Sequence, residues 1–194
     1  MSHAEQHSVR LAPLPREEWT PEAIRAMETL PTAMQPEPGR TINSLSVLAR
    51  HPRLAEAYLN FSLYLRFDAT LGDRVRELLI LRTAWRRGAA YELARHGRIA
   101  TRLGFTDDEL RRIATADAGD AWSPVESLLL SATDELCADH RVADATWSGL
   151  LDVFSEQEMM DIVVTVGAYD MMAMAFNTFG VRPEDDLPAF PPPG

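Results

Sequence analysis

Residues 70–103, TLGDRVRELLILRTAWRRGAAYELARHGRIATRL, decide the fold of this chain. The first half of the stretch is apolar around most of a helical circumference, which is typical of a helix buried on several sides. Arg87-Gly88 predicts a break, after which a second helical pattern begins. We therefore expect a central antiparallel pair of helices, at about residues 71–87 and 89–103, with the rest of the chain packed around it.

The start of the first helix is predicted by Thr70 and Asp73, which have the spacing of a capping box. Three ionisable side chains then fall on faces predicted to be buried. Glu77 points along an apolar strip of the first helix. Glu92 and His96 share one face of the second helix with Ile99, Ala100 and Leu103. Such groups either satisfy each other and hold the helices together, or form a proton-transfer site, and the spacing alone leaves both interpretations open.

The composition favours one folded domain, residues 1–194, because 46% of the residues are hydrophobic. A net charge of −10 and the absence of a basic stripe exclude nucleic acid as a partner. We see no apolar run as long as a membrane span and no leader-like segment at the start, so we expect no membrane association and a cytoplasmic location.

The cysteine and histidine residues limit the redox and metal chemistry. Cys137 is the single cysteine, so an intrachain disulfide and a CxxC dithiol are excluded. The five histidines are scattered without a zinc-type spacing, and we expect no cofactor and no metal. A metal held by Glu77, Glu92 and His96 is the minor alternative.

Boundary signals divide the remaining chain into further helices, and no alternating strand pattern is present, so the fold class is all-α. Residues 1–18 are predicted to be a loose arm, residues 31–40 a loop that can cover a pocket mouth, and the Pro-rich tail 181–194 an extended segment or one docked on a neighbour. The expected helix starts are Thr20-Pro21, Asn43, Pro52, Thr106 with Glu109, Ser123 with Glu126, Ala143, and Ser155 with Glu158; the glycines expected to end helices are Gly104 and Gly180.

One larger pattern combines these features: Arg76-Glu77-Leu78, Ile80-Leu81-Arg82, Tyr91-Glu92, His96, Ala100 and Gly104. It resembles the carboxymuconolactone decarboxylase family, the all-α superfamily that also contains alkyl hydroperoxidase D. The resemblance covers most of the chain and implies that helical fold. In the hydroperoxidase branch a glutamate precedes a C-x-x-C-x-x-x-H motif. This chain keeps Glu77 and His96 at the glutamate and histidine positions but has Ala89 and Glu92 where the two thiols belong, so dithiol peroxidase activity is not expected.

What remains at these positions is a set of acid/base groups. His96 can donate or accept a proton near neutral pH, and Glu92, one turn earlier, can orient the imidazole and raise its pKa. Glu77, if buried, can act as an acid or a base. Tyr91 can donate a hydrogen bond to a substrate oxygen.

The expected function is that of a cofactor-free acid/base enzyme, a decarboxylase or other lyase, an isomerase or a hydrolase, acting on a small oxygenated acid or lactone. A peroxidase-related protein with non-dithiol chemistry and a non-catalytic oligomeric binding protein are the alternatives. Arg82, Arg95 and Arg98 are candidates for binding substrate carboxylates. The last predicted helix carries more methionines than one face holds, and we expect a homo-oligomer (a dimer, trimer or hexamer) with a contact there; these are Met159, Met160, Met171, Met172 and Met174.

Overall fold

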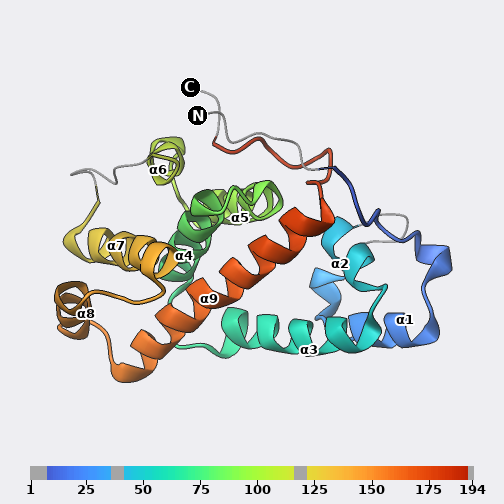
Figure 1. The fold of residues 1–194 in the computed structure, drawn as a ribbon, viewed down its shortest axis with the longest axis horizontal. Coiled ribbons are helices and arrows are strands. Elements are labelled where there is room, and N and C mark those ends of the chain that lie inside the picture. The colour runs from blue at the N-terminus through green and yellow to red at the C-terminus, as the bar shows by residue number, and fades with distance from the viewer. Residues whose placement is uncertain (1–7, 36–41, 116–121, 192–194) are drawn as a thin grey trace.

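The computed structural model describes residues 8–35, 42–115 and 122–191, and all regular elements in these residues are helical (Figure 1). This confirms the all-α prediction. The α-helices are α1 (Pro21–Met27), α2 (Asn43–Leu48), α3 (Pro52–Leu63), α4 (Asp73–Arg86), α5 (Ala90–Arg102), α6 (Asp107–Ile113), α7 (Pro124–Asp139), α8 (Asp144–Leu151) and α9 (Glu156–Phe179). Shorter turns are η1 (Arg16–Glu18), η2 (Thr32–Met34) and the π-helical turn η3 (Tyr64–Asp68).

Side-chain caps set most of the helix starts that the sequence predicted. The capping boxes that begin with Thr106, Ser123 and Ser155 are all present, and Thr20 accepts a hydrogen bond from the backbone N–H of Ala23. His51 likewise caps α3 through its ring nitrogen. These caps satisfy amide groups that have no partner in the first helical turn.

The predicted capping box of Thr70 and Asp73 is wrong. Helix α4 begins at Asp73 with Gly72 at the N-cap and no side-chain cap. Thr70 instead donates its backbone N–H (2.7 Å) and its hydroxyl (2.8 Å) to Asp161 of α9. The Thr70 hydroxyl, which the local pattern assigned to the helix cap, is therefore hydrogen-bonded to a carboxylate from a distant helix.

Helix α4 lies at the centre of the fold and packs against α5, α7 and α9. Every residue from Arg76 to Ala84 is buried, which confirms the expectation of a helix covered on several sides. One apolar core lies among α4 to α9, and a second joins α1, α2 and α3 to the C-terminal half of α9. On α5 the predicted face is buried at Glu92, His96 and Ala100, but Leu103 at its end is exposed.

Helix α9 runs diagonally across the molecule and connects the two cores (Figure 1). By length and composition it is apolar enough to span a membrane, contrary to the sequence expectation that no segment is. Half of its most apolar window is buried against the rest of the fold, and its Asp161 and Asp170 bind other elements. These are the features of a helix at the centre of a domain.

The described parts of both terminal segments are docked on this chain. In the N-terminal arm, Leu14 donates its N–H to the carbonyl of Ser46, and Arg10 and Leu11 donate to that of Phe179; the part of the arm that is described is therefore not loose. The C-terminal tail runs back across α5 (Figure 1). Residues 36–40, half of the predicted cover loop 31–40, lie outside the described residues.

Candidate active site

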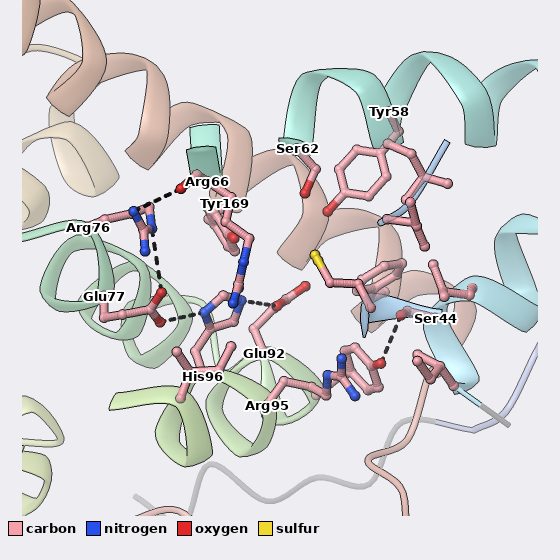
Figure 2. A pocket seen from close by; sticks show the side chains of 18 residues that line it. Ser44, Tyr58, Ser62, Arg66, Arg76, Glu77, Glu92, Arg95, His96 and Tyr169 are labelled. Atoms are coloured by element: carbon pink, nitrogen blue, oxygen red, sulfur yellow. Dashed lines mark hydrogen bonds and ion pairs between the residues drawn. The ribbon is translucent and has the colours of Figure 1, made fainter. Parts of the chain in front are cut away.

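A cavity of about 120 Å³ borders the second core and brings together residues of α2, α3, η3, α4, α5 and α9. One end, the more apolar one, includes Leu45 and Phe176 together with the hydroxyl-bearing side chains of Ser44, Tyr58 and Ser62 (Figure 2). The other end is charged and includes Glu77, Glu92 and His96. All four residues proposed from the sequence, Tyr91 included, line this cavity, as Figure 2 shows for the three charged ones.

The imidazole of His96 lies between two carboxylates (Figure 2). Its Nδ1 is 2.7 Å from Oε2 of Glu77 on α4, and its Nε2 is 3.4 Å from Oε2 of Glu92 one turn earlier on α5. Tyr169 of α9 holds the ring edge-to-face at a centroid distance of 5.0 Å. Contacts on both nitrogens and on the ring face fix the imidazole in one orientation.

These contacts favour the charged form of His96. Burial of the ring acts to lower its pKa, but the nearby carboxylate of Glu77 and its hydrogen bond, followed by those of Glu92, outweigh that effect and raise the pKa to about 9. The expectation that Glu92 raises this pKa is borne out in direction, with Glu77 as the larger contributor. At neutral pH the site therefore contains an imidazolium between two carboxylates.

Glu77 and Glu92 differ in their access to the cavity. Glu77 is completely buried, lies on the far side of His96 from the apolar end, and has Nε of Arg76 at 3.6 Å from its Oε1. Glu92 points past the imidazole toward the centre of the cavity (Figure 2). Of the two carboxylates, Glu92 is thus the one placed to meet a ligand directly.

Two arginines of the site were not proposed from the sequence. Arg76 is buried, and it donates to Asp73 at 2.6 Å and to the backbone carbonyl of Arg66 at 3.2 Å. The Arg66 side chain itself reaches into the cavity from η3 (Figure 2). The position of Arg76 next to Glu77 on a mostly apolar helix was a usable signal, whereas nothing in the pattern around Arg66 indicates a π-helical turn.

Of the three arginines that the sequence suggested, only Arg95 lines this cavity. Arg82 is buried elsewhere and pairs with Asp134 at 2.6 Å, so its role in the described residues is to join α4 and α7. Arg98 lies in a second, larger cavity of about 380 Å³ under the C-terminal tail, where Asp186 is 3.2 Å away. That cavity lacks the imidazole and both glutamates, so the smaller cavity is the candidate active site.

Tyr91 lies at the edge of the site. Its hydroxyl is 2.8 Å from the hydroxyl of Ser44 and donates to Glu184 at 3.2 Å, while its ring packs edge-on against Phe176. Burial raises its pKa, so the hydroxyl stays neutral. The structure therefore brings Tyr91 to the cavity wall, but its hydroxyl already has two partners.

The geometry of Glu77, Glu92 and His96 does not resemble a metal site. The two carboxylates contact opposite nitrogens of one ring, and no group of three metal-ligating side chains is found in the part of the chain that the structure describes. Cys137 is buried near Arg87, outside the residues that line the cavity, and burial raises the pKa of its thiol. No thiol therefore borders the candidate active site.

The fold and the site together define a class of protein: all-helical domains in which a buried histidine, here His96, lies between two glutamates, here Glu77 and Glu92. Residues 52–135, which contain all three of these side chains, match the carboxymuconolactone decarboxylase family. This match agrees with the family resemblance that the sequence indicated.

Solved structures share the fold at low sequence identity. An alkylhydroperoxidase AhpD core, an uncharacterized peroxidase-related protein from Ralstonia eutropha JMP134, is 20% identical, with a TM-score of 0.77 over 93% of this chain and 95% of that one. A peroxidase-related protein from Silicibacter sp. TM1040 is 15% identical, with a TM-score of 0.77 over 96% of both chains. The debrominase Bmp8 is 14% identical, with a TM-score of 0.71 over 92% of this chain and 94% of that one. No curated protein is significantly similar to the chain in sequence.

Proposed function

We propose that this protein is a cofactor-free acid/base enzyme acting on a small oxygenated acid or lactone, as a decarboxylase or other lyase, an isomerase or a hydrolase. The observation that carries the proposal is the imidazole of His96 held between Glu77 and Glu92 at the charged end of a cavity. A buried imidazolium with a carboxylate at each nitrogen can share protons with a bound ligand and stabilise negative charge that develops on it.

The three side chains have different roles in this proposal. The Glu92 carboxylate accepts a proton from the carbon next to a substrate carbonyl, which leaves an enolate and a protonated Glu92. The His96 imidazolium stabilises the enolate charge, and Glu77 keeps His96 protonated and oriented. Return of the proton from Glu92 to the same or another carbon completes exchange or isomerisation. In a decarboxylation the loss of CO₂ itself leaves the enolate, and the His96 imidazolium gives its proton to that carbon and is then protonated again from solvent.

The sequence proposed Glu77, Glu92 and His96 together as acid/base groups, with Glu92 at the position of a lost thiol. Because Glu77 is completely buried behind the ring, we assign it a positioning role and give the contact with substrate to Glu92 and His96. Tyr91 contributes to the wall of the cavity.

The test is turnover of a panel of small 2-oxo acids and lactones by the wild-type protein and by Glu92→Gln and His96→Gln. We expect at least one compound to be turned over, with kcat/KM reduced by about 100-fold or more in each variant. Matched controls are Glu156→Gln and His140→Asn, which change exposed residues at the ends of α9 and α7. A compound that both site variants turn over as fast as the wild-type protein does contradicts the assignment.

The same panel, extended with hydroperoxides, separates this proposal from the two alternatives. A peroxidase-related function predicts consumption of hydroperoxides that depends on Cys137, whereas the acid/base proposal predicts that Cys137→Ser leaves turnover of the panel unchanged. A non-catalytic binding protein predicts binding without turnover of any compound and therefore contradicts the proposal directly.

A further inference from the structure

We propose that Arg66 is the anion-recognition residue of this cavity and that the ligand is a small monocarboxylate whose other end is apolar. The inference rests on the proposed function, because it names the substrate class of the same site. It depends on three features: a cation without a carboxylate partner, a rigid turn that presents it, and the size and lining of the cavity.

The guanidinium of Arg66 differs from the other cations of the cavity. Arg76 is paired with Asp73 and Glu77, His96 with Glu77 and Glu92, and Arg95 has Glu184 at 3.9 Å. Within the described residues, the Arg66 guanidinium has no carboxylate within ion-pair distance, and its contact is with the ring of Phe67 at 5.5 Å. A half-buried cation without a counter-charge favours an anionic ligand.

Arg66 is held in place by a clamp on the π-helical turn η3. Asp161 of α9 accepts the hydroxyl of Tyr64 at 2.9 Å at one end of the turn, and the N–H and hydroxyl of Thr70 just beyond the other end. Although burial opposes it, these hydrogen bonds hold the pKa of Asp161 below its usual value. The carbonyl of Arg66 is also bound by Arg76. A π-helical turn is rare and is often found at functional sites; here it places the backbone of Arg66 so that its side chain enters the cavity (Figure 2).

The size and lining of the cavity limit the rest of the ligand. A cavity of ~150 Å³ accommodates the six carbon atoms of benzene, so the 120 Å³ available here fits roughly five to six non-hydrogen atoms. The wall of the cavity away from the charged groups includes Met34, Leu45 and Phe176, and the hydroxyls of Ser44 and Tyr91 in that wall are hydrogen-bonded to each other. A carboxylate at Arg66 places the short apolar end of such a ligand against Met34, Leu45 and Phe176 and its middle atoms beside Glu92.

The experiment is a titration of the full-length protein with butyrate and with butyramide, its neutral isostere, followed by NMR of the His96 imidazole. We expect butyrate to shift the His96 signal until the site is saturated. Butyramide is expected to bind at least about tenfold more weakly than butyrate. Arg66→Gln is expected to weaken butyrate binding by about tenfold or more and to abolish the preference over butyramide. Arg66→Lys is expected to retain part of the preference for butyrate. The control variant Arg53→Gln changes an exposed arginine of α3 and is expected to leave that preference unchanged.

Two results overturn the inference: equal binding of butyrate and butyramide to the wild-type protein, or unchanged butyrate binding in Arg66→Gln. Thermal unfolding of each variant confirms that it is folded before binding is compared. The outcome is independent of catalysis. If binding depends on Arg66 but no compound is turned over, the proposed function fails and the anion site stands. If turnover depends on Glu92 but butyrate binding does not change in Arg66→Gln, the proposed function stands and the anion site fails.

Discussion

The buried imidazolium of His96 makes the stability of this protein depend on pH above neutrality. Its pKa rises from 6.5 to about 9 in the folded chain, chiefly because the nearby carboxylate of Glu77 outweighs the cost of burial. A histidine whose folded-state pKa is raised contributes stability that is fully present below the unfolded pKa. That contribution is lost as the pH rises through the folded value.

The expected loss follows from the size of the shift. At about 1.4 kcal/mol per pKa unit, the free energy of unfolding falls by an amount on the order of 3 kcal/mol between about pH 6 and about pH 10 through this one group. The assay is urea unfolding at a series of pH values for the wild-type protein and for His96→Gln, which removes the titrating ring. Other groups titrate in the same range, so the informative quantity is the difference between the two curves.

The imidazole can also be titrated directly by NMR, with its signal assigned by its loss in His96→Gln. A midpoint near pH 9 agrees with the arrangement of the two carboxylates. Equal loss of stability in the wild-type protein and in His96→Gln, together with an imidazole midpoint near its unperturbed value, would refute the reasoning.

Three further predictions concern residues around the site. Glu77→Gln removes a completely buried charge that pairs with Arg76 and His96, and it should lower the free energy of unfolding by about 3–5 kcal/mol in denaturant titrations and also lower the pKa of His96. Gly97→Ala places a methyl group 2.8 Å from the ring of Phe190, so limited proteolysis should cut the C-terminal tail faster. Its effect on overall stability should stay within about 1 kcal/mol because alanine favours the helix. Met174 is 60% exposed on α9, and Met174→Glu should shift the expected homo-oligomer toward monomer in light scattering; an unchanged mass places the contact elsewhere.

The sequence predicted the central helices and the buried polar face because both depend on local periodicity. Glu92 and His96 lie one turn apart on one helix, so their contact follows from helical geometry. The contact between His96 and Glu77 crosses two helices, and it was suggested by the family resemblance and not by spacing. Capping boxes were equally readable where the side chain had only its own helix to bind, as at Thr106 and Ser155.

The parts that the sequence did not predict depend on contacts between distant segments. Thr70 was assigned to a cap but binds Asp161, a carboxylate that approaches from α9. The same carboxylate holds Tyr64 and so fixes the turn that directs Arg66 into the cavity. Because a π-helical turn differs from an α-helix only in its hydrogen-bond pattern, residue types alone do not reveal it. The arginine that completes the proposed anion site was therefore visible only in three dimensions.

The proton-transfer role of Glu92 and His96 is tested most directly by hydrogen–deuterium exchange at C3 of 2-oxobutyrate in D₂O, followed by NMR. This probe carries the carboxylate and the acidic C–H bond that the proposed site requires, and exchange needs only the first proton transfer and its reversal. The wild-type protein and Glu156→Gln should accelerate exchange above the buffer rate, while Glu92→Gln and His96→Gln should lower the enzymatic rate by about 100-fold. Exchange at the buffer rate with the wild-type protein, or equal exchange with Glu92→Gln, would contradict acid/base catalysis at this site.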